Sequence, residues 1–581
     1  MGDFFETGEV FGVIQSPQDR IDTYRQKGWW SGETVDSIFR RAVLAGGDNE
    51  ALVDPPNRAA MGLLGEPRRL DWQQVDASVN AVARAFQAHG VGRDDIVLAQ
   101  LPNIVEGVLA FLACARIGAI LSPTPMAYRE HELRALLGKI KPALILTVDR
   151  FGTHAHAATA VKLRDAGLFD GSVICVGASE TAGAAPLDLT LANDLVLPDP
   201  PIEAAETLTI CWTSGTEATP KGVPRHHDHW RVNGEALVEA TGLQDGDVLL
   251  NPFPLINIAA FGGVVMPWLL RAGTMVQHHP FDAGIFLEQL ISERVNYTVA
   301  PPAILNMLLK NEAMLAGADL SHLRCLGSGS APLSPWMVRG WQERHGVPVM
   351  NVFGSNEGCS LFSSSLDVAD PDLRARLFPR FGVAGLGWNS SFASKVRTRL
   401  VDPDTDTIIT TAGQPGELRL DGAMVFDGYW QAGELDKSCF DEDGYFRTGD
   451  LFEIASDDGE RFYRFVGRSK EIIIRGGVNI SPAELDSLIE GHPAVREAAC
   501  IGFPDERLGE RVCAVVALKP GQSLSLEQLI DFLKDEALAT YKLPERLKVV
   551  DALPRNSLGK ILRRELNAEP QASSPVEGAI S

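Results

Sequence analysis

The stretch 207–222, TLTICWTSGTEATPKG, constrains the fold of this chain more than any other. Its first residues alternate, with Leu208, Ile210 and Trp212 on one side, and a period of two predicts a half-buried β-strand. The residues that follow, up to Lys221, are rich in glycine, proline and hydroxyl groups, so they leave backbone N–H groups available. N–H groups beside hydroxyls and an ammonium favour the binding of a polyphosphate.

Short apolar strands alternate with amphipathic helices on both sides of this stretch. Strands are predicted at 96–99, 119–121, 143–148, 248–250, 274–277, 297–299 and 323–326, and helices at 71–90, 103–118 and 129–140. Such alternation predicts two α/β lobes built on parallel sheets. Gly and Asp turns separate short strands in 397–451, which predicts a β-rich subdomain.

A third kind of composition begins near residue 467. Ser481 and Glu484 form a capping box with Pro482 at the first helical position, which predicts a helix in an α+β domain. The predicted organisation is a large N-terminal domain, a small C-terminal α+β domain and a disordered tail, at 1–467, 468–566 and 567–581.

The charge balance excludes several classes of partner. The 581 residues include 53 basic and 76 acidic side chains, and a net charge of −23 argues against nucleic acid and anionic membranes. The longest apolar run, 255–270, is too short and too interrupted to span a bilayer. The eight cysteines have no C-x-x-C spacing. Scattered free thiols in a reducing cytoplasm explain them better than disulfides or a zinc site. We therefore expect a cytoplasmic protein without a transmembrane segment.

The wording TSGTEATPKGV resembles the phosphate loop of the adenylate-forming superfamily, which includes acyl-CoA synthetases, aryl-acid adenylases and luciferases. Five further segments are similar to motifs of that superfamily, in the same order: GSGSAPL (327–333), NVFGSNEG (351–358), YFRTGDL (445–451), GRSKEIIIRGGVN (467–479) and LPRNSLGKILRREL (553–566). The resemblance covers residues 20–566. It implies an AMP-forming acyl-CoA synthetase that uses ATP, Mg²⁺ and coenzyme A.

The resemblance also implies roles for single residues. Nucleotide and CoA binding is implied for Thr213, Ser214, Gly215, Thr216, Gly329, Ser330, Ala331, Phe353, Asn356, Asp450, Arg468, Lys470, Gly476 and Gly477. Among them Phe353 would stack on adenine, Asn356 would contact the α-phosphate and Asp450 would accept the ribose hydroxyls. Phe353 and Asn356 stand where most members have Tyr and Thr.

Three residues are implied to act on the reacting groups: Lys221, Glu357 and Lys560. Glu357 would hold Mg²⁺ together with Thr216. The Lys560 ammonium would bridge the acid carboxylate and the α-phosphate, which otherwise repel each other. The C-terminal domain would turn about Lys470 between the two half-reactions.

The segment 251–263 resembles the acyl-pocket segment of the superfamily. Aryl adenylases that bind hydroxybenzoates carry Asn where this chain has Ile258, and Ile cannot bond a ring hydroxyl. The predicted pocket is lined by Asn257, Ile258, Phe261, Pro302 and Gly327. We expect a medium-chain, alicyclic or other bulky apolar acid.

Two other functions stay open: an adenylase that loads a carrier-protein phosphopantetheine, and a nucleotide-binding protein with a decayed site. A homodimer is also left open. The spacing of His226, His227 and His229 does not match a recognised zinc set, although a metal site there is an alternative.

The role implied for Lys560 can be tested directly. We expect Lys560→Ala to lower acyl-adenylate formation by at least about a hundredfold, because a preorganised charge at the reacting phosphate is lost. Thioester formation from supplied acyl-adenylate should be spared. Pyrophosphate release and thioester formation would be measured separately, and an equal loss in both steps would show that this role is wrong.

Overall fold

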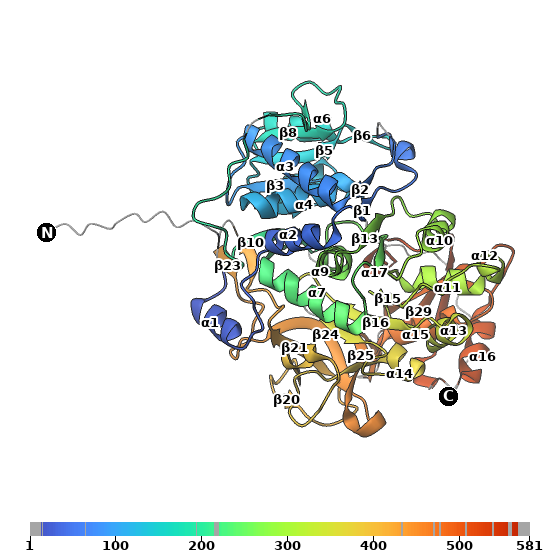
Figure 1. Cartoon of the computed structure of the whole chain (residues 1–581). Helices are drawn as coiled ribbons and strands as arrows, with labels where there is room; N and C mark the ends of the chain where they lie inside the picture. The colour runs from blue at the N-terminus through green and yellow to red at the C-terminus, as the bar shows by residue number, and fades with distance from the viewer. Residues whose placement is uncertain are drawn as a thin grey trace. The chain divides into compact units, whose positions relative to one another are not determined.

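The computed structural model describes most of the chain. The described residues are 13, 15–63, 66–192, 194–213, 220–358, 360–431, 434–468, 471–475, 478–505, 508–536, 538, 540–555 and 561–566. They divide into two compact units, Met1–Arg399 with Arg419–Thr448 and Asp457–Tyr463, and Leu400–Leu418 with Gly449–Ser456 and Arg464–Ser581. The order of elements along the chain can be followed in Figure 1.

The first unit contains a nine-stranded sheet in the order β23-β22-β11-β10-β4-β3-β5-β8-β9. Its strands are β3 (Ile96–Ala99), β4 (Ile120–Pro123), β5 (Leu144–Val148), β8 (Ser172–Val176), β9 (Ala185–Pro186), β10 (Thr207–Trp212), β11 (Gly222–His226), β22 (Tyr429–Gln431) and β23 (Glu434–Asp436). The strands from β10 to β9 are parallel, while β10, β11, β22 and β23 pair antiparallel. The two-stranded ribbon of β6 (Arg150–Phe151) and β7 (His154–Ala155) stands apart.

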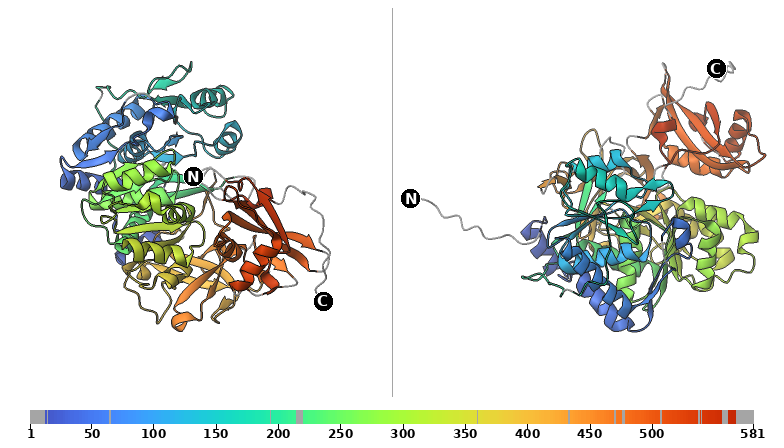
Figure 2. Two further views of the ribbon diagram at one scale, coloured as in Figure 1. Left: turned by 90° about the vertical axis from the view of Figure 1, so that its right-hand side faces the viewer. Right: turned by 90° about the horizontal axis from the view of Figure 1, so that it is seen from above.

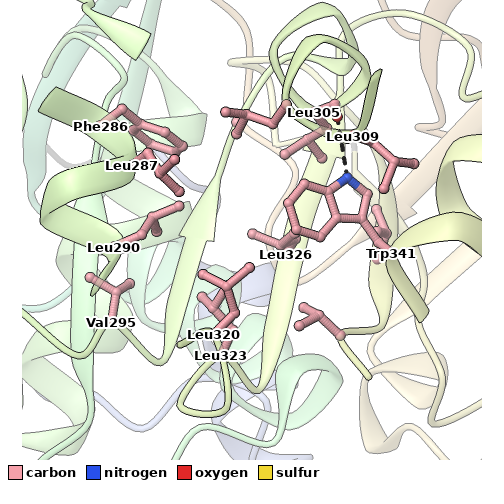
Figure 3. Close-up of a cluster of buried hydrophobic side chains, with 14 of the residues drawn as sticks. Phe286, Leu287, Leu290, Val295, Leu305, Leu309, Leu320, Leu323, Leu326 and Trp341 are labelled. Carbon is pink, nitrogen blue, oxygen red and sulfur yellow. Dashed lines mark hydrogen bonds between the residues drawn. The ribbon is translucent and has the colours of Figure 1, made fainter. Parts of the chain in front are cut away.

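The same unit holds an eight-stranded sheet in the order β17-β16-β15-β14-β12-β13-β1-β2. Its strands are β1 (Glu50–Val53), β2 (Arg69–Asp71), β12 (Val248–Asn251), β13 (Thr274–Gln277), β14 (Tyr297–Val299), β15 (Cys325–Gly329), β16 (Val349–Gly354) and β17 (Ser360–Ser363). On one face the sheet packs against α10 (Ala283–Ser292), α11 (Pro302–Lys310) and α13 (Pro335–His345), and Figure 3 shows this cluster around Leu326 and Trp341. The indole of Trp341 donates to the Leu305 carbonyl at 3.3 Å, so even the polar atom of this core is paired.

The helices predicted at 71–90, 103–118 and 129–140 are observed at Trp72–Ala88, Val105–Ile117 and Glu130–Leu137, with ends within three residues of the predicted ones. Asp71 caps α3 (Trp72–Ala88) in a capping box with Gln74, and Gly118 ends α4 (Val105–Ile117) with a φ of 76°. The other helices are α1 (Gln18–Gln26), α2 (Val35–Gly46), η1 (Arg58–Met61), α5 (Glu130–Leu137), α6 (His156–Asp165), α7 (His227–Thr241), α8 (Ile258–Ala260), η2 (Phe261–Val265), α9 (Met266–Arg271), α10 (Ala283–Ser292), α11 (Pro302–Lys310), α12 (Glu312–Leu315), α13 (Pro335–His345), α14 (Pro371–Arg376), η3 (Ser391–Ser394), η4 (Asp457–Glu460), α15 (Pro482–Glu490), α16 (Leu526–Asp535), η5 (Thr540–Lys542) and α17 (Arg563–Leu566).

The strand β10 corrects one expectation, because it is buried on both faces rather than on one. Ile210 and Trp212 pack into a cluster with α5 and α6. On the opposite face, the Thr209 hydroxyl accepts a hydrogen bond from the Trp230 indole of α7 at 3.0 Å. The alternating side chains of β10 therefore point to two faces that are both covered by helices, and the polar Thr209 is hydrogen-bonded inside the protein.

The predicted β-rich part is a six-stranded sheet in the order β18-β25-β24-β21-β19-β20. Its strands are β18 (Leu377–Pro379), β19 (Val396–Val401), β20 (Ile408–Ile409), β21 (Gly416–Gly422), β24 (Phe446–Ile454) and β25 (Phe462–Arg468). The division between the two units falls within β19, β21, β24 and β25.

The second unit ends in an α+β sheet. Its strands are β26 (Ile473–Arg475), β27 (Val478–Ile480), β28 (Val495–Asp505), β29 (Gly509–Leu518) and β30 (Arg546–Val550). Leu485 of α15 and Leu529 of α16 pack on one face of this sheet, which Figure 2 draws in orange and red, and Leu566 of α17 packs on the other. Two α/β sheets, a β-rich part and this α+β part confirm the predicted fold class.

Two further findings concern membranes and thiols. Within the described residues, no helix is long and apolar enough to cross a bilayer. The described cysteines are free thiols, and most of them are buried.

The core of the eight-stranded sheet gives a stability prediction. Leu326 is 1% exposed and Leu44 is 85% exposed. We expect Leu326→Ala to lower the free energy of unfolding by about 3 kcal/mol, because the buried side chain leaves a cavity. The same substitution at Leu44 should cost less than about 0.5 kcal/mol. Urea unfolding measures both, and equal losses would contradict this account of the core.

Candidate active site

The two ends of the glycine-rich loop face each other across a hairpin. The Thr213 N–H donates to the Lys221 carbonyl at 3.0 Å, and the Lys221 N–H donates to the Thr213 hydroxyl at 3.3 Å. These bonds continue the antiparallel pairing of β10 with β11, in which Trp212 lies opposite Gly222. The loop residues predicted to bind phosphate, Ser214, Gly215 and Thr216, lie outside the described residues.

Tyr429 brings two predicted residues together. Its hydroxyl donates to the Glu357 carboxylate at 2.8 Å, and the Lys221 ammonium lies 5.0 Å from the centre of its ring. Glu357 is 7% exposed, so this bond orients a nearly buried carboxylate. Tyr429 is a residue that sequence reasoning missed, because its segment DGYW reads only as a turn and a strand. A carboxylate and an ammonium beside the loop are groups that can hold a cation and a phosphate.

Asn356 links the loop strand to the segment predicted to bind the acid. Its Nδ2 donates to the Trp212 carbonyl at 3.2 Å, and its Oδ1 accepts from the Ile258 N–H at 2.9 Å. An amide nitrogen carries two hydrogens, so Nδ2 can serve one further acceptor. One side chain, in the turn after β16, therefore joins the end of β10 to the start of α8.

Arg225 holds the backbone of this region through hydrogen bonds to three carbonyl groups, a role that the sequence did not indicate. It is 1% exposed and donates to the carbonyls of Asn356, Met424 and His229 at 3.4, 3.0 and 3.1 Å. Its guanidinium lies 4.2 Å from the centre of the Trp230 ring. Burial disfavours the charged form and lowers the pKa of Arg225 to about 9, so the group is still charged at neutral pH.

Close backbone packing explains two glycines of the motifs. A Cβ on Gly358, where φ is 84°, would lie 1.8 Å from the Met424 carbonyl oxygen, and one on Gly329 would lie 2.1 Å from that of Val352. Gly329 ends β15, and Ser330 and Ala331 follow it as exposed residues. Phe353 is half-buried on β16, with its ring 6.1 Å from Phe378.

The residues predicted to line the acid pocket differ in exposure. Asn257 caps α8, where its Oδ1 accepts from the Ala260 N–H at 3.2 Å, and Ile258 is half-buried. Phe261 is 1% exposed, and its ring packs against Phe111 and Trp230 at 4.9 and 5.4 Å. Gly327 lies buried in β15, and buried Pro302 begins α11.

The other predicted residues belong to the second unit. Asp450 is 6% exposed, and the Arg468 Nε lies 3.2 Å from its Oδ1. The carboxylate is thus oriented by a cation within its own unit. Lys470, Gly476, Gly477 and Lys560 lie outside the described residues.

The histidine group forms a helix cap. Atoms of His226, His229 and Asp427 that could bind a metal lie within 4.8 Å of one another. The Nδ1 atoms of the two histidines accept each other's backbone N–H at the start of α7, at 3.2 and 3.5 Å. A neutral imidazole that accepts at Nδ1 carries its proton on Nε2, where no lone pair remains for a metal. Asp427 is meanwhile paired with Arg20 at 2.7 Å. The contacts therefore favour a structural role.

Two family models match the chain. The model of the AMP-binding enzyme matches residues 39–430, and that of the AMP-binding enzyme C-terminal domain matches residues 484–560. The first match alone spans more than half of the chain.

Several curated proteins resemble the chain over nearly its whole length. An indoleacetate–CoA ligase of Aromatoleum aromaticum is 31% identical over 86% of this chain and 93% of its own. A medium-chain fatty-acid–CoA ligase of Escherichia coli is 30% identical over 94% and 92%. A salicylyl-CoA synthase/salicylate adenylyltransferase of a Streptomyces species is 30% identical over 96% and 97%. Among solved structures, ATP-bound MatB of Rhodopseudomonas palustris has a TM-score of 0.74 and 27% identity, covering 92% of this chain and 98% of its own.

Burial of His227 predicts acid sensitivity. Its Nδ1 accepts from the Val35 N–H at 3.0 Å, and burial lowers its pKa from 6.5 to about 3. The unfolded chain therefore binds a proton that the folded chain does not, so stability is lost as pH falls from 6.5 towards 3. The wild type should lose free energy of unfolding when the pH is lowered from 7.5 to 5.5. We expect this loss to be about 1.4 kcal/mol smaller in His227→Gln.

Urea unfolding at the two pH values measures this difference. His131→Gln, at an exposed position, is the control and should leave the loss unchanged. A variant at His227 with the acid sensitivity of the wild type would contradict the role of burial.

Proposed function

Because the chain belongs to the AMP-binding enzyme family, we infer that it is an ATP-dependent carboxylic acid:CoA ligase. The acid carboxylate attacks the α-phosphorus of ATP, and pyrophosphate leaves to give the acyl-adenylate. The CoA thiol then loses its proton and attacks the acyl carbon, and AMP leaves with the electrons of the broken C–O bond. The products are acyl-CoA, AMP and pyrophosphate.

The observation that supports this proposal is that Lys221 and Glu357 both contact Tyr429. These contacts lie next to the hydrogen-bonded residues that flank the glycine-rich loop. A loop rich in N–H groups and a cation can bind the phosphates of a nucleoside triphosphate, and an oriented carboxylate can bind its metal ion. Glu357 and Thr216 are the residues proposed to hold Mg²⁺, which would supply positive charge to the phosphate oxygens. Lys221 is proposed to stabilise the departing pyrophosphate.

The remaining roles follow the motifs. We propose that Phe353 stacks on adenine and that Asn356 donates to the α-phosphate. Asp450 is proposed to accept hydrogen bonds from the ribose hydroxyls, and Arg468 to contact the ribose or a phosphate. Lys560 is proposed to serve the first half-reaction only, with Lys470 as the pivot of a C-terminal domain that begins at residue 468. We assign the reaction to the cytoplasm, where ATP and CoA occur together.

The acid is proposed to have a bulky apolar body. Ile258 and the small residues that follow it favour such an acid. The relatives are named for indoleacetate, medium-chain fatty acids and salicylate, which all have an apolar body. A rival function is the loading of a carrier-protein phosphopantetheine, which would follow the same adenylate formation.

A mass-spectrometric assay tests the proposal. Purified protein is mixed with MgATP, CoA and a panel of straight-chain, alicyclic and aryl acids, and AMP with one or a few acyl-CoA masses is expected. Acyl-adenylate without acyl-CoA would instead support the carrier-protein function. Neither product with any acid, despite measurable ATP binding, would support a decayed site and overturn the ligase assignment.

A further inference from the structure

The phenol of Tyr297 is a buried polar group whose oxygen has no hydrogen-bond partner among the described residues. Tyr297 lies on β14 and is 1% exposed. Burial raises its pKa well above the ordinary value, so the oxygen keeps its proton. Buried polar groups in folded proteins are nearly always paired, with protein, with water or with a ligand. The hydrogen-bonding capacity of the Tyr297 phenol is therefore unused among the described residues.

The position of this phenol follows from strand geometry. Successive side chains of a strand point to opposite faces of a sheet. Leu326 on the neighbouring β15 belongs to the core beneath α10, α11 and α13, so Gly327 faces the other side. A Cβ on Gly327 would lie 2.7 Å from the Tyr297 hydroxyl oxygen and 3.2 Å from Val299. The phenol thus lies over Gly327, on the face of the sheet away from that core.

This face also meets the segment proposed to bind the acid. The helical turn η2, which begins at Phe261 directly after Ile258 and two alanines, packs against β14. Tyr297 and Val299 share one strand, and Gly327 is the small residue that leaves room for the phenol. The Tyr297 hydroxyl therefore lies next to Gly327, one of the residues predicted to line the acid pocket.

We propose that the Tyr297 hydroxyl is a specificity-determining group that hydrogen-bonds one polar atom of the acid. The inference rests on the proposed ligase function and narrows its substrate class. A phenol both donates and accepts, so it suits a ring hydroxyl, a ring N–H or a carbonyl. The acid is then a molecule with a bulky, largely apolar body that carries one oxygen or nitrogen on the part remote from its carboxylate. Ile258 offers no such bond, and Tyr297 supplies it from a different strand.

Matched acids test this assignment. Phenylacetate and 3-phenylpropanoate are compared with their analogues that carry a hydroxyl at ring position 2, 3 or 4, by kcat/KM for acyl-CoA formation. We expect at least one hydroxylated acid to exceed its parent by about tenfold in the wild type, because the parent leaves the phenol unpaired. In Tyr297→Phe this preference should vanish through slower turnover of the hydroxylated acid alone.

Tyr463→Phe is the matched control. It removes another buried hydroxyl, which lies 3.2 Å from that of Thr398 and away from β14, so the preference among acids should be kept. A wild type without any preference, or a Tyr297→Phe enzyme with the preference of the wild type, would overturn the role of Tyr297 while the ligase function stands. No thioester from any acid would overturn the ligase function and this inference with it.

Discussion

The antiparallel pairing of β10 with β11 is the constraint on which the candidate site depends. It closes the glycine-rich loop between Thr213 and Lys221, and it sets β11 next to β22, which carries Tyr429. The rest of this sheet from β10 to β9 is parallel, and parallel strands need long crossovers. The hairpin fixes Thr213 and Lys221, the described residues that flank the loop, at the end of a buried strand.

The guanidinium of Arg225 is buried, and among the described residues no carboxylate contacts it directly. Arg225 donates to carbonyl oxygens of Asn356, Met424 and His229, so dipoles offset part of the cost of burying it. The pKa near 9 keeps this guanidinium positive at neutral pH. Its positive potential lies directly behind Asn356, the residue proposed to meet a phosphate, and favours anions there.

Local pattern was sufficient to predict much of the fold. The strands at 96–99, 274–277 and 297–299 agree residue for residue with β3, β13 and β14, because each is a short apolar run between turn signals. The burial of β10 was mispredicted, since alternation cannot distinguish solvent from a covering helix that pairs Thr209. Tyr429, Arg225 and Tyr297 were missed because their contacts join segments far apart in the sequence. Motif wording, by contrast, identified Lys221 and Glu357, which the structure brings to one tyrosine.

The double contact of Asn356 has a consequence for how substrates are handled. One amide side chain bonds both the end of the loop strand and the first N–H of α8. A shift of either partner must therefore strain or release the bond to the other. If nucleotide and acid order these two segments as proposed, their binding is thermodynamically linked. Such linkage is reciprocal: the factor by which the acid alters affinity for nucleotide equals the factor by which nucleotide alters affinity for the acid.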